Sequence, residues 1–177
     1  MFIIPGFVIS LVTFPGVIVH ELAHQLFCRW NKVAILKTCY FRLGNPAGYV
    51  LHEIPKHAHK SLLIGLGPFF VNTILGAIIA FPAALPVIKF NCGDALDYVL
   101  VWLGVSIAMH AIPSRGDAKA MREAVSSDEV PVSLRILTYP AVMIINLADL
   151  GRFFWLDAIY GVAVTTALPT LCVMLFK

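Results

Sequence analysis

Two histidines and a glutamate fall within one short segment, His20-Glu21-Leu22-Ala23-His24. Residues four apart lie on one face of an α-helix, so both imidazoles can reach a single metal ion. The glutamate beside the first histidine can act as a general base towards a water molecule held there. Ionisable groups in an apolar helix are costly and usually mark function. We therefore predict that His20 and His24 bind one zinc ion and that Glu21 is catalytic.

A catalytic zinc site needs a third protein ligand and an open position for water. The candidate is Asp117, which follows the apolar segment that ends near Ile112. An alternative is that Asp117 only caps the helix expected to begin at Ala118. His110 is a second candidate for the third ligand, although we prefer a buried or supporting role for it. We predict His20, His24 and Asp117 as the metal ligands.

Asn72 lies shortly after Gly67-Pro68, near the start of another apolar segment. Its amide can hydrogen-bond a substrate carbonyl or an oxyanion near the metal, and we include it among the catalytic candidates. The alternative is a hydrogen bond between helices, which is a common use of asparagine in membranes. A further polar cluster, His52, Glu53, His57 and His59, is interpreted as part of a solvated loop.

The composition favours a membrane protein. The 177 residues are 59% hydrophobic and 13% charged, with a mean hydropathy of +0.86. Soluble domains carry about 25% charged residues. The net charge of +3 comes without a dense basic patch interleaved with aromatics, so no nucleic-acid partner is expected.

Five apolar segments approach the length of about 20 residues that spans a bilayer as a helix. They cover about 2–27, 62–88, 96–112, 134–150 and 154–176. Residues 33–54 are rich in β-branched and aromatic residues around a turn, which predicts a short β-hairpin. The expected fold is an all-α membrane protein with about five transmembrane helices and a β-hairpin-like segment after the first.

We expect one multi-pass membrane domain over 1–177. It would comprise a metalloprotease-like core (1–120), a cytoplasmic loop (121–133) and an additional transmembrane hairpin (134–177). Basic residues concentrate in the connections 29–60 and 113–133. Because basic loops favour the cytoplasmic side, these connections and the active site are expected at the cytoplasmic face.

The motifs together resemble the site-2 protease family of intramembrane zinc metalloproteases. The residues that carry the resemblance are His20, Glu21, His24, Gly67, Pro68, Asn72 and Asp117. The order of these motifs matches the family over about residues 16–120. The family's aspartate usually precedes a glycine, whereas Gly116 precedes Asp117 here. The resemblance implies a minimal, divergent member, in which the β-rich segment holds an extended substrate as an added strand.

The expected function is a zinc-dependent intramembrane endopeptidase that hydrolyses peptide bonds in or near the bilayer. Its partners would be a transmembrane protein substrate and the lipid bilayer. One alternative is a non-catalytic membrane protein with structural or regulatory zinc, in which His110 or a loop histidine supplies a fourth ligand. Another is an ion transporter that uses His20, Glu21 and Asp117 as an ion path.

Overall fold

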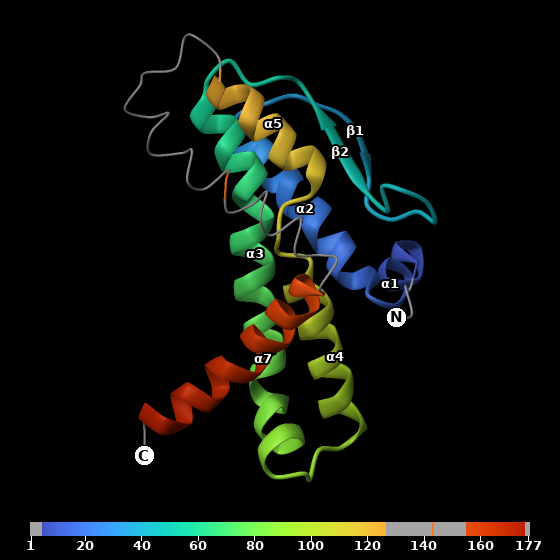
Figure 1. Ribbon diagram of the computed structural model, residues 1–177, viewed down its shortest axis with the longest axis vertical. Coiled ribbons are helices and arrows are strands. Elements are labelled where there is room, and N and C mark those ends of the chain that lie inside the picture. The colour runs from blue at the N-terminus through green and yellow to red at the C-terminus, as the bar shows by residue number, and fades with distance from the viewer. Residues whose placement is uncertain (1–4, 127–142, 144–154, 176–177) are drawn as a thin grey trace.

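The computed structural model describes residues 5–126, 143 and 155–175, which form a mostly helical protein with a two-stranded sheet (Figure 1). The elements are α1 (Gly6–Val12), α2 (Phe14–Trp30), β1 (Ile35–Cys39), β2 (Tyr49–His52), α3 (Ala58–Ala84), a π-helical turn η1 (Leu85–Lys89), α4 (Ala95–Met109), α5 (Arg115–Ser126) and α7 (Leu156–Leu175). The apolar segment 134–150 lies outside the described residues, apart from position 143.

The long helix α3 is the centre of the molecule. It packs against α2, α4, α5 and α7, and α7 also packs against α4. In Figure 1, α4 runs beside the lower half of α3, and α5 lies beside its upper end. The predicted core boundary at residue 120 lies within α5, which continues to Ser126.

Small residues bring the helices together near the histidine segment. A Cβ atom on Gly16 of α2 would overlap the carbonyl oxygen of Ser106 on α4. On α3, a Cβ on Gly76 would lie 2.7 Å from the Gly104 oxygen of α4. Such close backbone approach needs glycine and is typical of helices packed within membranes. One turn beyond the Gly16–Ser106 contact, α2 carries His20, and His110 follows the last residue of α4 as its C-cap.

The first predicted span is broken into two helices. α1 and α2 meet at Thr13 with a bend of 88°. The Thr13 hydroxyl donates a hydrogen bond to the Ile9 carbonyl at 2.7 Å, which ends α1. Pro15 lies in the first turn of α2, where a missing backbone N–H costs nothing. The proline therefore starts α2 and does not kink a continuous helix.

The two short strands expected after the first helix are confirmed. β1 and β2 pair antiparallel, with Cys39 opposite Tyr49 and Ile35 opposite His52. Among the described helices, the sheet contacts α2 alone, so it lies beside the histidine segment. The loop between the strands, residues 40–48, reaches back over α2 and takes part in the site described below.

The prediction of about five transmembrane helices is wrong for the described residues. Among the described helices, α3 with its continuation η1, over Ala58–Lys89, is the one long and apolar enough to cross a membrane. α4 has 15 residues, about 22 Å at 1.5 Å per residue, against a bilayer core of about 30 Å. The apolar stretch Leu156–Cys172 is also short. α1 and α2 pass the test only as a bent pair. Hydropathy identifies apolar segments, but it does not show where each helix begins and ends.

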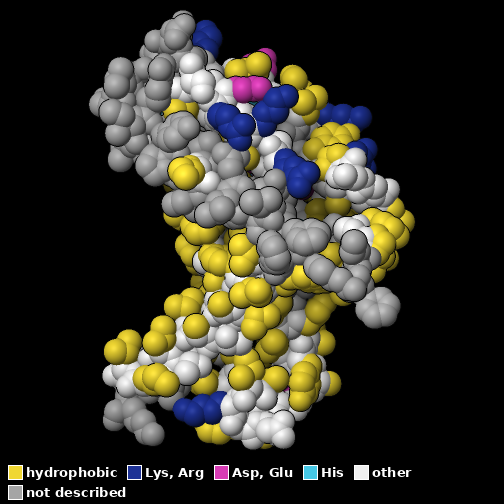
Figure 2. Space-filling model, in the orientation of Figure 1, with side chains coloured by type: hydrophobic (Ala, Val, Ile, Leu, Met, Phe, Trp, Pro, Cys, Tyr) yellow, Lys and Arg dark blue, Asp and Glu magenta, His cyan; other side chains and the backbone are white. Residues whose placement is uncertain are grey.

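The surface of the helical part is strongly apolar. One face of α3 exposes large side chains at helical spacing: Phe70, Ile74, Ile78 and Phe81. Figure 2 shows hydrophobic side chains over the middle and lower parts of the visible face, while most of the visible Lys and Arg gather near the end that carries α5. A water-exposed monomer rarely shows an apolar surface of this extent.

Candidate metal centre

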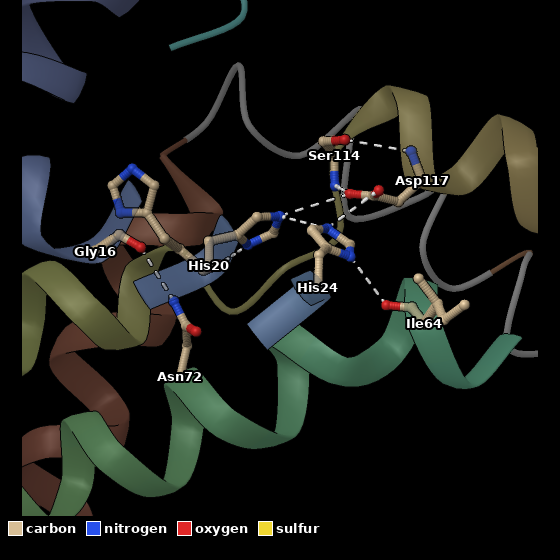
Figure 3. A network of polar contacts seen from close by, with 8 residues as sticks. Gly16, His20, His24, Ile64, Asn72, Ser114 and Asp117 are labelled. Carbon is tan, nitrogen blue, oxygen red and sulfur yellow. Dashed lines mark hydrogen bonds and ion pairs between the residues drawn. The ribbon is translucent and has the colours of Figure 1, made fainter. Parts of the chain in front are cut away.

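Asp117 converges with His20 and His24, although it lies more than 90 positions after them in the chain (Figure 3). One ligand atom from each residue lies within 4.8 Å of the others. The two Nε2 atoms are 3.1 Å apart. His20 Nε2 lies 3.6 Å from Asp117 Oδ2, and His24 Nε2 lies 3.2 Å from Asp117 Oδ1. All three side chains are largely buried.

Backbone carbonyls set the orientation of both imidazole rings. His20 Nδ1 lies 2.6 Å from the His110 carbonyl oxygen, and His24 Nδ1 lies 2.9 Å from that of Ile64. A carbonyl oxygen only accepts, so each Nδ1 carries the proton and donates it. In the neutral rings, each Nε2 therefore presents a lone pair. The two lone pairs and the Asp117 carboxylate face one another with no donor between them.

A cation resolves this crowding of acceptors, and zinc fits the spacing. Zinc binds histidine nitrogen at about 2.0–2.1 Å and carboxylate oxygen at about 2.0–2.2 Å in a tetrahedral arrangement. Ligand atoms at such distances are about 3.3 Å apart along each edge of the tetrahedron. The separation of 3.1 Å between the two Nε2 atoms and that of 3.2 Å between His24 Nε2 and Asp117 Oδ1 agree with that length. His20 Nε2 lies 3.6 Å from the other carboxylate oxygen. Imidazoles that donate their second N–H to carbonyls are also usual in metal sites.

Asp117 is held by a reciprocal pair of hydrogen bonds with Ser114. The Ser114 backbone N–H donates to Asp117 Oδ2 at 2.8 Å, and the Asp117 N–H donates to Ser114 Oγ at 3.2 Å. This is a capping box at the start of α5. The expected alternatives for Asp117, metal ligand or helix cap, are therefore compatible: its carboxylate takes part in the cap and also faces the histidines.

The carboxylate of Asp117 is ionised in this setting. Burial alone would raise its pKa, but when no metal is bound a protonated His24, together with the contacts of His20 and His24, holds the pKa of Asp117 well below its usual range. An ionised carboxylate is the form that binds a metal ion. The side chain is therefore ready to act as a ligand at neutral pH.

Glu21 lies beside the three candidate ligands and is 7% exposed. It lines a cavity of about 700 Å³ together with His20, His24 and Asp117. The cavity lies between α2, the strand β2 and the beginning of α5. Glu21 therefore borders the same open space as the three candidate ligands.

His110 and the loop histidines stand apart from the group of three. The Nδ1 atom of His110 bonds the Ser106 carbonyl at 2.9 Å, and its own carbonyl orients His20. The rings of His57 and His59 stack on each other with centroids 5.5 Å apart. Within the described part of the chain, His20, His24 and Asp117 form the only His/Cys/Asp/Glu group compact enough to hold a metal.

Asn72 occupies the interface between three helices. It is fully buried, and its amide nitrogen donates to the carbonyls of Gly16 at 3.3 Å and Ile107 at 3.1 Å. Figure 3 shows its side chain directed at Gly16 of α2, one turn before His20. These contacts favour the interhelical role over contact with substrate.

The supporting partners differ in how visible they are in the sequence. Ser114 has a readable signal, because serine three residues before an acidic residue predicts a capping box. The carbonyls of Ile64 and His110 have none, since every residue carries that group and only the packing of α3 and α4 selects these two. Gly48, whose contact with Glu21 is described below, also has no local signal.

Comparison with family models, with curated proteins and with solved structures finds no match to this chain. The assignment of the site therefore rests on the geometry of its own residues.

Proposed function

We propose that this protein is a zinc-dependent endopeptidase of the membrane, with His20, His24 and Asp117 as ligands and Glu21 as general base. The observation that carries the proposal is the convergence of three acceptor atoms, each oriented by a second hydrogen bond, beside a carboxylate and an open cavity. The motif order shared with the site-2 protease family supports the same reaction class.

A bound zinc ion would supply Lewis-acid activation of a water molecule. Glu21 takes a proton as the water oxygen attacks the scissile carbonyl carbon. The C–O bond forms, the C–N bond breaks, and the proton passes from Glu21 to the leaving amine. The products are a carboxylic acid and an amine, so the reaction consumes one water and needs no other reactant. General acid–base catalysis of this kind contributes about 10²–10⁴-fold.

The group of three suits catalysis better than structural zinc. Structural sites are closed by four protein ligands, whereas catalytic sites keep one position open for water. Among the described residues, the cluster offers three ligands and borders a cavity. The fully buried, already bonded Asn72 makes direct oxyanion contact a poor fit, so we assign it to the support of α2.

The site is proposed to lie at the cytoplasmic boundary of the bilayer. Ala58–Lys89 is 32 residues long, about 48 Å as a helix. A span centred on a core of about 30 Å leaves about 9 Å outside at each end. Ile64, whose carbonyl holds His24, lies about 9 Å from the helix start. Water can reach the metal at that depth, and the basic residues nearby favour the cytoplasmic side.

Replacing Glu21 with glutamine tests the proposal, because glutamine keeps the shape and loses the base. Purified wild type and Glu21→Gln would be compared for zinc content and for cleavage of a transmembrane reporter segment. We expect equal zinc and a loss of cleavage of at least about 100-fold. Full cleavage by a zinc-loaded Glu21→Gln protein would rule out the proposed mechanism. A wild type that holds zinc and cleaves no membrane segment would rule out the function.

A further inference from the structure

Gly48 packs directly against the side chain of Glu21. Gly48 is buried, and a Cβ atom added there would lie 2.7 Å from Glu21 Cγ and 2.9 Å from Glu21 Oε1. Real Cβ atoms do not approach other heavy atoms this closely. The backbone of Gly48 therefore packs against the Glu21 side chain and limits where that side chain can lie.

The opposite side of Gly48 is closed as well. The same Cβ would lie 3.0 Å from the backbone oxygen of Tyr40. A methyl group added at Gly48 has Glu21 on one side and main chain on the other, so the glutamate side chain is the part that must give way. No described glycine has a positive φ, so alanine meets no backbone penalty here and the effect is purely one of space.

The loop that carries Gly48 is tied to α2 at one end and braced by hydrogen bonds within itself. We call residues 40–48, between β1 and β2, the strap. The Tyr40 hydroxyl bonds Gln25 Oε1 on α2 at 2.7 Å. Within the strap, the Arg42 N–H donates to the Ala47 carbonyl at 2.7 Å, and Arg42 Nε donates to that of Pro46 at 2.9 Å. These bonds resist a shift of the strap away from Glu21.

The contact also lies where two cavities meet. Gly48 and Glu21 both line the cavity that contains His24 and Asp117, of about 700 Å³. They also line a second cavity of about 440 Å³, which reaches Val17 and Met109. A substrate that runs through both cavities passes Glu21 beside the strap. The position of the Glu21 carboxylate therefore decides how that carboxylate meets the scissile bond.

We propose that Gly48 is a positioning residue for Glu21. The strap backbone holds the Glu21 carboxylate towards the metal group, and only glycine leaves room for it. The inference rests on the proposed function and names a residue on which that function depends. A misplacement of a catalytic group by about 1 Å can cost about 100-fold in rate.

Gly44→Ala is the matched control for Gly48→Ala. Both glycines lie in the strap, and both changes add one methyl group. A Cβ on Gly44 meets only Arg42 Nε, at 3.9 Å, which is ordinary contact. Any general effect of stiffening the strap appears in both variants, whereas displacement of Glu21 appears only in Gly48→Ala.

The experiment uses the full chain loaded with Co²⁺, whose visible absorption reports on its ligands. Wild type, Gly44→Ala, Gly48→Ala and Glu21→Gln are titrated with Co²⁺ and then with acetohydroxamate. A hydroxamate chelates the metal and places its acidic hydroxyl proton towards a neighbouring carboxylate. We expect similar Co²⁺ affinity in all four proteins. Acetohydroxamate should bind about 10- to 100-fold more weakly to Gly48→Ala and Glu21→Gln, which is the worth of one charge-assisted hydrogen bond.

The cleavage assay adds a second readout. Gly48→Ala should lower kcat about 10- to 100-fold with little change in KM, and Gly44→Ala should stay within about 3-fold of wild type. Unchanged hydroxamate affinity in Gly48→Ala beside a weakened Glu21→Gln overturns the positioning role. So does equal weakening in Gly44→Ala, or loss of Co²⁺ binding in Gly48→Ala alone. Four proteins that bind acetohydroxamate equally also overturn it, because Glu21 is then not at the metal.

The two proposals fail in different ways. A wild type that binds Co²⁺ and acetohydroxamate but cleaves nothing contradicts the endopeptidase, while the comparison of Gly48→Ala with Gly44→Ala still tests the contact. A wild type that binds no metal overturns both.

Discussion

The carboxylate of Asp117 bonds Ser114 through Oδ2 and faces His24 through Oδ1. The Ser114 N–H lies 2.8 Å from the first oxygen, and His24 Nε2 lies 3.2 Å from the second. The start of α5 and the helix α2 are thereby joined through one side chain. Asp117 is oriented by the helix cap before any metal binds, which lowers the ordering cost of binding.

Asp117→Asn should weaken zinc binding strongly while leaving the helix cap intact. Asparagine keeps an oxygen that accepts from the Ser114 N–H, but it lacks the charge that a metal ligand supplies. Loss of a supporting partner costs about 10- to 100-fold in metal affinity, and loss of a ligand should cost more. Competition titration with a chromophoric chelator measures the Kd. Glu123→Gln, on the same helix, is the control and should match wild type.

The pH dependence of the free energy of unfolding should reveal the ionisation of Asp117 in the metal-free protein. Its pKa is lower in the folded state than in the unfolded chain. The resulting stabilisation is fully present above the unfolded pKa, which is about 4, and is lost as the pH falls through the folded value. In EDTA, wild type should therefore exceed Asp117→Asn in free energy of unfolding at pH 5. That difference should shrink at pH 3, and a difference that grew on acidification would contradict the assignment.

Ser114→Ala should lower stability more than metal affinity. The change removes the hydroxyl that accepts from the Asp117 N–H but leaves the backbone donor that holds the carboxylate. Loss of such a cap costs about 1 kcal/mol. Thermal unfolding in detergent would measure this beside Ser126→Ala at the other end of α5, which we expect to be neutral. A zinc affinity reduced as far as in Asp117→Asn would mean that Ser114 binds the metal itself.

Much of the site was predictable, because its signals are local. The spacing of His20 and His24 follows from helical geometry, and the serine and aspartate at 114 and 117 form a recognisable capping pattern. Their approach to one another was expected from the order of apolar segments, although the number of spans was wrong. Hydropathy does not register the 88° bend at Thr13 or the short length of α4. The three residues still converge, because this requires the middle of α2 to meet the start of α5 and not a particular count of membrane crossings.

The role of Asn72 could not be decided from the sequence. Its residue type suits both substrate contact and an interhelical bond, and the choice depends on which face of α3 packs against α2 and α4. Gly48 is a clearer case, since its contact with Glu21 comes from the path of the strap. Neither relationship is encoded in a short motif.

Asn72→Leu should reduce stability more than catalysis. Leucine has a similar size and removes the amide that bonds the carbonyls of Gly16 and Ile107. The expected loss is about 1–3 kcal/mol in the free energy of unfolding, as for a buried hydrogen-bonding group. Chemical denaturation measures the loss, and zinc Kd and kcat are measured on the folded fraction. A kcat reduced about 100-fold with unchanged stability would restore Asn72 to the catalytic residues.

The most direct test of the central claim is X-ray absorption at the zinc edge of the purified, zinc-loaded wild type. The account predicts one zinc per chain, bound by two imidazoles and a carboxylate, with the remaining scatterer being oxygen from water. Three or more imidazoles, any sulfur ligand, or an unaltered spectrum in Asp117→Asn would contradict the metal site formed by His20, His24 and Asp117.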